Sequence, residues 1–278
     1  MYERLSYSIW KKDHKSILEN FSDKKVIVTY SGGKDSSVIL YFLQKAAADF
    51  NFIFETHAAL FPHHVFTEAD ITRLVHYWNN RGVDITWLEV PVPEEHLARA
   101  VQDGDSPCLT CIRSKKASLI NNFKQSNSQW KDLVVIMSYS LWDLVSATIE
   151  HILGTHYSPD ENTVPFQKEN SEKRFLGTFQ RFYPLLKLEN GLTVFNPLIR
   201  YNDQEINNVI SEKKIPLTTT SCRYREYRPK RLFAEYYKKS GLRFEFDKVF
   251  DFAKKTLNLP EISYFENLET DTYVKKML

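Results

Sequence analysis

The strongest constraint on the fold is a short apolar run that leads through two glycines into a segment with helical periodicity. Residues 25–30 (KVIVTY) are mostly β-branched or apolar, which is typical of a buried parallel strand. Residues 31–37 (SGGKDSS) follow, and apolar side chains then recur at helical spacing over residues 38–46. Adjacent glycines between a strand and a helix let successive backbone N–H groups face one point. This segment therefore predicts an anion-binding turn inside a β-α unit.

The alternation of strand and helix continues along the chain. Strands are expected at residues 52–60, 84–90 and 133–137, and helices at residues 68–80, 94–102, 141–153, 203–213 and 229–239. This alternation needs right-handed crossovers, which build a parallel sheet covered on both faces. Asn190-Gly191 predicts a hairpin between residues 179–188 and 192–195. We therefore predict an α/β fold with a parallel doubly wound sheet and a smaller C-terminal α/β extension.

Three parts of the chain differ in character. Residues 1–22 are expected to form an N-terminal helical segment, and residues 23–222 the nucleotide-binding catalytic domain. Within that domain the polar, proline-containing residues 154–177 indicate a mobile loop or lid. Residues 223–278 are expected to be a basic and aromatic helical C-terminal extension. Its tail from residue 257 has little periodicity, so we expect it to pack loosely or to reach a neighbouring subunit.

The composition is that of a globular enzyme. No stretch approaches the roughly 20 apolar residues that a membrane-spanning helix needs, and residues 1–14 are polar, without the apolar core of a signal peptide. We therefore expect a cytoplasmic protein with no membrane partner, and we consider a homodimer. The net charge of +2 neither demands nor excludes a nucleic-acid partner. Three cysteines in a chain without an export signal favour metal binding or thiol chemistry over disulfides.

The SGGKDSS segment has the residue types that a phosphate-binding loop needs. Its hydroxyl groups can donate hydrogen bonds, and Lys34 supplies a full positive charge. The spacing G-x-x-x-x-G-K-[S/T] of a Walker A loop is absent. The alternative is a plain strand-to-helix turn, but six matching residues in this context favour nucleotide binding. The candidate nucleotide-binding residues are Ser31, Gly32, Gly33, Lys34, Asp35, Ser36 and Ser37.

The cysteines form a second candidate site. Cys108 and Cys111 make a C-x-x-C pair, and Cys222 is the remaining thiol. The pair by itself is compatible with half of a zinc site, a redox pair or part of an iron–sulfur site. A second C-x-x-C pair is absent, which weakens a closed zinc site with four ligands. The alternative is three free cysteines that pack as small apolar residues.

The loop resembles that of the PP-loop ATP pyrophosphatase superfamily, also called the adenine-nucleotide α-hydrolase type. Enzymes of this superfamily generally cleave ATP between the α and β phosphates and transfer AMP to a substrate oxygen. The resemblance implies that the loop holds the departing pyrophosphate and that Asp35 binds Mg²⁺, which prefers carboxylate and phosphate oxygens. The alternative for Asp35 is an acidic residue that complements the helix dipole.

Residues 25–231 resemble one branch of this superfamily, the tRNA 2-thiocytidine and 2-thiouridine synthetases. The matching positions are residues 61–65 (FPHHV), Cys108, Cys111, Lys115, residues 196–198 (NPL) and Cys222. The resemblance implies that the three cysteines hold a [4Fe–4S] cluster with one open iron. It also implies a catalytic role for Lys115.

Two departures from that branch bear on the substrate. The family has a Gly-His-His-x-Asp-Asp run after the fourth strand, whereas residues 138–143 read SYSLWD. Asp143 is the residue of that run that this sequence retains, so it is our candidate for a second metal-binding or acid–base carboxylate. The paired-cysteine zinc modules of the thiouridine branch are absent from the sequence. These differences place a shared tRNA substrate in question.

Basic and aromatic residues alternate near the end of the chain. They fit an RNA- or phosphate-facing surface and an amphipathic packed helix equally well. Arg223 and Arg225, beside Cys222, are the ones we expect to face the active site. The set is Arg223, Tyr224, Arg225, Tyr227, Arg228, Lys230, Arg231, Phe233, Tyr236, Tyr237, Lys238, Lys239 and Arg243.

The resulting hypothesis is ATP-dependent sulfur transfer to a nucleobase carbonyl, with AMP and pyrophosphate as products. The expected catalytic residues are Lys115, Asp143 and Asp35, and the expected cofactors are ATP, Mg²⁺ and the [4Fe–4S] cluster. The substrate is a tRNA base or a free purine or pyrimidine, and the sulfur comes from a cysteine desulfurase or from free sulfide. The alternatives are an amidating or nitrile-forming enzyme that uses ammonia, and a non-catalytic nucleotide- or RNA-binding protein.

Overall fold

A computed structural model describes residues 5–61, 66–103, 106–126, 130–156 and 176–277 of the chain. Its sheet has the strand order β3-β2-β1-β4-β6-β5. The strands are β1 (Lys25–Thr29), β2 (Phe54–Leu60), β3 (Ile85–Glu89), β4 (Leu133–Ile136), β5 (Leu185–Lys187) and β6 (Thr193–Phe195). Strand β5 runs antiparallel to β6, and the other pairings are parallel. The predicted parallel α/β sheet is confirmed.

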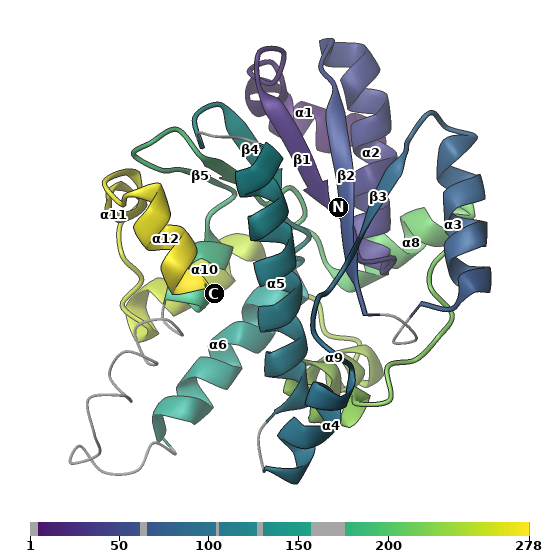
Figure 1. Cartoon of the computed structure of the whole chain (residues 1–278). Coiled ribbons are helices and arrows are strands. Elements are labelled where there is room, and N and C mark those ends of the chain that lie inside the picture. Colours follow the sequence, from purple (N-terminus) through teal and green to yellow (C-terminus); the bar gives the residue numbers. More distant parts are fainter. Residues whose placement is uncertain (1–4, 62–65, 104–105, 127–129, 157–175, 278) are drawn as a thin grey trace.

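Helices cover both faces of this sheet, and Figure 1 shows α5 on the near face with α1 and α2 behind the strands. The helices are α1 (Tyr7–Leu18), α2 (Lys34–Phe50), α3 (Glu68–Asn79), α4 (Glu95–Gln102), α5 (Pro107–Ser126), α6 (Leu141–His156), α8 (Asp203–Lys213), α9 (Pro229–Lys239), α10 (Phe246–Thr256), α11 (Ile262–Glu266) and α12 (Thr270–Met277). Among the described residues, no helix combines the length and apolarity needed to span a membrane.

Two hydrophobic cores lie on opposite faces of the sheet, and the central strand contributes to both. Val26 and Val28 of β1 belong to the core beneath α1, α2, α3 and α8, whereas Ile27 belongs to the core beneath α6 and the C-terminal helices. Successive side chains of a strand point to opposite faces, so a strand buried on both sides is apolar throughout. This arrangement leaves the strand ends as the place for polar chemistry.

The N-terminal helix α1 packs on the first hydrophobic core. Trp10, His14 and Leu18 are buried at helical spacing. The indole N–H of Trp10 donates to the carbonyl oxygen of Pro197 at 3.2 Å, and Nε2 of His14 lies 2.9 Å from the same oxygen. The predicted N-terminal helix is therefore present and packs against the loop that follows β6.

The C-terminal tail from residue 257 differs from the expectation of loose packing, because it buries apolar side chains, including those of α11 and α12, on the second core. Leu257 is 7% exposed, Phe265 is fully buried, and Val274 is 3% exposed. The buried side chains are divided among short helices separated by turns, so no long helical period was visible in the sequence. Among the described residues of the C-terminal extension, all regular secondary structure is helical, and turns separate the helices.

Other boundaries also differ from the sequence-based expectation. Helix α5 was not anticipated, and the expected strand 179–188 is shorter, because residues 176–182 are helical. The expected lid at residues 154–177 falls mainly on residues 157–175, and the FPHHV motif mainly on residues 62–65. Both of these stretches lie outside the described residues.

Candidate nucleotide and thiol site

The candidate site lies where parallel strands end. Strand β1 leads into the loop of residues 31–36, which we term the phosphate loop, and β4 leads to Ser140 and α6. Figure 1 shows the first turns of α5 and the whole of α9 near this same end of the sheet. Loops at the carboxyl ends of parallel strands meet above the sheet, which is the usual place for ligands in such folds.

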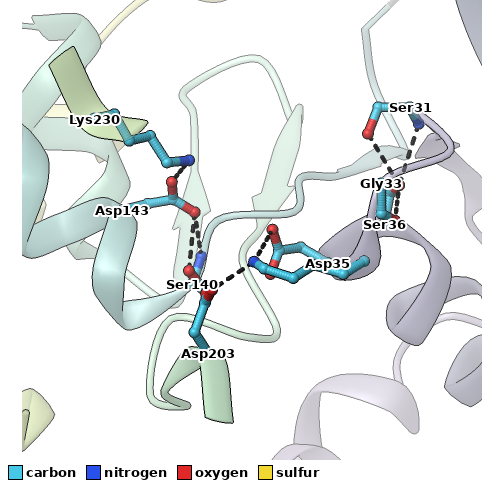
Figure 2. Close-up of polar contacts among 9 residues, drawn as sticks. Ser31, Gly33, Asp35, Ser36, Ser140, Asp143, Asp203 and Lys230 are labelled. Atoms are coloured by element: carbon cyan, nitrogen blue, oxygen red, sulfur yellow. Dashed lines mark hydrogen bonds and ion pairs between the residues drawn. The ribbon is translucent and has the colours of Figure 1, made fainter. Parts of the chain in front are cut away.

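Hydrogen bonds from one buried serine shape the phosphate loop (Figure 2). Ser36 Oγ donates to the Gly33 carbonyl oxygen at 3.1 Å and accepts from the Ser31 N–H at 3.2 Å. It also lies 3.0 Å from Ser31 Oγ. Ser36 and Ser37 are both buried, whereas Ser31 is exposed. Ser36, one of the three serines expected at the nucleotide, therefore organises the loop in this structure, and Ser31 has the most accessible side chain of the three.

Gly32 and Gly33 have separate roles. Gly32 has a φ of +69°, and a Cβ at this position would lie 2.5 Å from Thr218 Cγ2 and 2.8 Å from Phe66 Cε1. Gly33 is the N-cap of α2 in an extended conformation, without a side-chain capping hydrogen bond. Because the first N–H groups of a helix lack intrahelical partners, they remain available to an anion. The predicted turn between β1 and α2 is therefore present, and its binding of an anion stays a prediction.

Lys34 is held between two carboxylates. Its Nζ lies 2.8 Å from Asp35 Oδ1 and 2.8 Å from Asp203 Oδ1 (Figure 2). Burial alone would lower the pKa of Lys34, but the two negative charges outweigh it and raise this pKa. Burial also raises the pKa of the Asp203 carboxyl, against the opposing effect of Lys34. The sequence predicted that a helix begins at Asp203, but it did not indicate that this side chain pairs with Lys34.

Asp143 is buried, and its two carboxylate oxygens have different partners. Its Oδ2 accepts from the N–H of Ser140 at 2.8 Å and from Ser140 Oγ at 3.0 Å. Its Oδ1 forms an ion pair with Nζ of Lys230, from the first turn of α9. Loss of hydration and the charge of Lys34 lower the pKa of Lys230 to about 8, against the effect of Asp35. The Lys230 side chain is 49% exposed to solvent.

A threonine-rich segment, residues 217–222, connects the phosphate loop to Cys222. The N–H of Thr218 donates to the Gly32 carbonyl oxygen at 3.0 Å. Hydroxyl groups of Thr219 and Thr220 each donate to the buried Asp70 carboxylate of α3 at 2.9 Å. Burial would raise the pKa of Asp70, but hydrogen bonds from Arg73, Thr220 and Thr219 lower it well below its usual range. Sequence analysis missed Asp70 because nothing near it in the chain marks its partners.

The three cysteines occupy one region, although Cys222 is distant from the others in sequence. Cys108 and Cys111 lie on the first turn of α5, and the Cys108 thiol donates to the Tyr224 carbonyl oxygen at 3.5 Å. Burial raises the pKa of Cys108 and of Cys111, and the charge of Cys222 raises both further. Arg228 opposes these shifts at both thiols. Each of the three cysteines is half-buried, and none of them forms a disulfide.

The basic side chains near the thiols differ in part from those expected. Arg228, rather than Arg223 or Arg225, influences both Cys108 and Cys111. Arg223 pairs instead with Glu94 at the exposed edge of α4. The expected Lys115 does lie in this region, where it lowers the pKa of Cys111 and its Nζ is 5.9 Å from the centroid of the Phe61 ring.

The residues present fit the two expected metal cofactors to different degrees. Asp35 and Asp203 offer carboxylate oxygens of the kind that Mg²⁺ prefers, now bound to the Lys34 ammonium group. Thiols that share one region form the donor set of an iron–sulfur site. Within the described part of the chain, however, no group of three or more His, Cys, Asp or Glu side chains is arranged to hold a metal ion. Cluster binding therefore requires the three thiols to draw together.

Solved structures with a similar fold are known, although no protein-family model and no curated protein matches the sequence. The U34-tRNA thiolase NcsA from Methanococcus maripaludis, solved with its [4Fe–4S] cluster, has a TM-score of 0.56 and 13% identity, over 94% of this chain and 85% of that one. NMN synthetase from Francisella tularensis has a TM-score of 0.47 and 9% identity, over 98% and 92%. NH₃-dependent NAD synthetase from Campylobacter jejuni has a TM-score of 0.41 and 12% identity, over 98% of this chain and 92% of that one.

Proposed function

The chain has the fold of the PP-loop ATP pyrophosphatases, and from that premise we propose that it is an ATP-dependent enzyme that transfers sulfur to a nucleobase carbonyl. The observation that carries the proposal is the placement of three thiols at the carboxyl end of the strands, where the phosphate loop also lies. Segment 217–222 links the two directly, because Thr218 contacts Gly32 and Cys222 ends the segment. The NcsA structure, a thiolase with a cluster, is consistent with this pairing.

In the first proposed step, the carbonyl oxygen of the nucleobase attacks the α-phosphorus of ATP. A new oxygen–phosphorus bond forms while the bond to pyrophosphate breaks. The N–H groups at the start of α2 and the Lys34 ammonium group stabilise the departing negative charge. Asp35 and Asp203 would hold Mg²⁺, which would neutralise phosphate charge, and Lys34 would then turn from these carboxylates toward the phosphates.

In the second proposed step, hydrosulfide attacks the activated carbon. The carbon–sulfur bond forms, AMP leaves with its oxygen, and the sulfur proton passes to a base or to water. A [4Fe–4S] cluster held by Cys108, Cys111 and Cys222 would supply an open coordination position for hydrosulfide. Lys115, whose charge acts on Cys111, would polarise the carbonyl or move protons. The substrate is a free nucleobase compound or a tRNA base.

The test is anaerobic purification followed by iron and sulfide analysis, and then product analysis with ATP, a panel of nucleobase compounds and tRNA, and either sulfide or ammonium. We expect about four irons per chain, as a cluster of this type contains, with AMP and pyrophosphate formed and sulfur incorporated only with sulfide. Incorporation of nitrogen from ammonium would support the amidating alternative. ADP and phosphate as products would contradict the whole assignment, and tight ATP binding without turnover would support a non-catalytic role.

A matched pair of variants separates the two sites. Cys222→Ser removes one thiol and leaves the phosphate loop intact, so sulfur transfer should be lost while ATP affinity is kept. Gly33→Val instead adds bulk where the helix N-terminus meets the ligand, so ATP binding should be lost with the thiols unchanged. Loss of ATP binding in Cys222→Ser would contradict the proposed separation.

A further inference from the structure

The C-terminal extension contributes one cationic side chain, Lys230, to the carboxyl end of the strands, where the phosphate loop lies. Lys230 is on the first turn of α9, outside the β-α units that build the sheet, and its Nζ contacts the Asp143 carboxylate of α6. The charges of Asp35 and Lys34 act on it as well, which places it beside the phosphate loop. Figure 2 shows Lys230 and Asp143 at the upper left, Asp203 below them beside Ser140, and Asp35 to the right.

The position of Lys230 is set by packing elsewhere on α9. Tyr237 of the same helix is 2% exposed, and its ring meets Trp142 of α6 edge-on, with 5.3 Å between centroids. The Tyr237 ring also contacts Phe244 at 5.0 Å, and the Phe244 N–H donates to Asn202 Oδ1 at 2.9 Å. Asn202 immediately precedes Asp203. The helix that presents Lys230 is therefore anchored to α6, which carries Asp143, and through Phe244 to Asn202, which precedes Asp203.

The charges of this group are not balanced. Asp35, Asp143 and Asp203 contribute three negative charges, and Lys34 and Lys230 contribute two positive ones. Both lysines form ion pairs with carboxylates of this group. Asp143 already accepts two hydrogen bonds from Ser140, and Lys230 retains 49% of its side-chain exposure. A lysine ammonium group on a flexible stem can exchange a carboxylate oxygen for a phosphate oxygen without helix movement.

We propose that Lys230 is a second phosphate-binding residue of the nucleotide site, supplied by the C-terminal extension and held in place by Asp143. The inference deepens the proposed function and depends on it, because it requires ATP at the phosphate loop. Lys34 contacts the phosphates from the loop side, and Lys230 contacts them from the side of α6. The alternative role for Lys230 is purely structural, as the counter-ion that prevents an uncompensated buried Asp143 charge.

The test compares Mg·ATP affinities by calorimetry. Lys230→Met should weaken binding by about 10-fold, the effect of losing one charge-assisted contact, and Lys230→Arg should keep most of the affinity. Lys239→Met removes an exposed lysine from the last turn of the same helix and should have no effect. Adenosine, which has no phosphate, should bind wild type and Lys230→Met equally. Weaker adenosine binding in Lys230→Met would overturn the inference.

A double variant separates phosphate binding from the structural role. In Asp143→Asn the buried charge is gone, so a counter-ion is no longer needed. Adding Lys230→Met to this background should still weaken Mg·ATP binding by about 10-fold if Lys230 contacts phosphate. Equal affinity of the single and double variants would overturn the inference. Absence of ATP binding in the wild type would overturn the proposed function itself, whereas wild-type binding that Lys230→Met preserves would overturn this inference alone.

Discussion

At the scale of single residues, Gly32 is under the tightest steric constraint at the site. Its left-handed φ and the nearby Thr218 and Phe66 side chains leave no room for a Cβ. Thr218 cannot withdraw freely, because its N–H and hydroxyl group both contact the Gly32 carbonyl oxygen. One residue thus fixes the loop conformation and the attachment of segment 217–222. Ser36 also stabilises the loop conformation, through its hydrogen bonds with Ser31 and Gly33.

Gly32→Ala should therefore destabilise the protein and abolish ATP binding. Gly82→Ala is a matched control, since Gly82 has a φ of +71° but open space where the Cβ would lie. The backbone cost of about 1 kcal/mol is common to both variants, so any excess in Gly32→Ala reports the steric clash. Urea unfolding and ATP titration measure the two effects. Equal loss of stability in the two variants would contradict the clash.

At the scale of elements, α3 holds the segment that leads to Cys222. The Asp70 side chain is 2% exposed and accepts hydrogen bonds from Thr219, Thr220 and Arg73. Arg73 also donates to the Leu217 carbonyl oxygen at 2.6 Å. One carboxylate on one helix therefore fixes a segment without regular secondary structure, and this segment connects the two candidate sites.

Asp70→Asn should loosen segment 217–222, because an amide accepts fewer hydrogen bonds and carries no charge for Arg73. We expect a loss of about 2–3 kcal/mol in unfolding free energy and faster alkylation of Cys222. Glu68→Gln, at an exposed position of the same helix, should change neither quantity. The low folded-state pKa of Asp70 also implies that this contribution is present above the unfolded pKa of about 4 and falls away in acid.

Helix α1 should confer a pH dependence on stability through His14. Burial lowers the pKa of His14 to about 4, against the raising effects of the Pro197 carbonyl group and Asp13. The unfolded chain therefore binds a proton that the folded chain excludes between pH 6.5 and about 4. The stabilisation is complete above the unfolded pKa of 6.5 and falls by up to about 3 kcal/mol as the pH drops through this window.

The comparison of wild type with His14→Gln measures this contribution. Glutamine can still donate to the Pro197 carbonyl oxygen but does not titrate, so its unfolding free energy should vary less between pH 7 and pH 4. Parallel curves for the two proteins would show that His14 is not the source. His76→Gln serves as a control, because His76 lies on the surface helix α3 and bonds Asn80.

At the scale of the whole molecule, charge bears on the substrate. The chain has 37 basic and 35 acidic residues, and α9 divides its side chains between the core and solvent. Tyr237 packs inside, whereas Leu232 and Tyr236 are more than 60% exposed. The helix therefore has a packed face and an accessible face, and a role of the accessible face in binding RNA or phosphate stays a prediction.

We expect weak tRNA binding, because near-neutral proteins release few counterions on nucleic acid. A gel-shift titration at two salt concentrations measures the affinity and its salt dependence. A small nucleobase substrate predicts weak binding with a shallow salt dependence. Tight binding that weakens steeply with salt would contradict this expectation and favour a tRNA base, with Lys238→Glu and Lys239→Glu then locating the surface.

Several features could be predicted from sequence because they depend on neighbouring residues. The start and end of α8 and of α9 agree with the predicted ranges, since Asn202 and Glu205 form a capping box and Pro229 occupies the first helical turn. The phosphate loop was identified for the same reason, as its shape comes from two glycines and a serine within six residues. The C-x-x-C pair was equally local, although the helix that carries it was not anticipated.

The sequence by itself thus determined the parallel α/β sheet, the phosphate loop and the spacing of the first two cysteines. Tertiary structure alone decided that Asp203 and Asp35 share Lys34, that Lys230 pairs with Asp143, and that Asp70 holds Thr219 across 149 residues of sequence. The physical reason is that periodicity and capping act within a few residues along the chain. A buried charge instead takes its partner from whichever segment the packing of distant elements brings within hydrogen-bond distance.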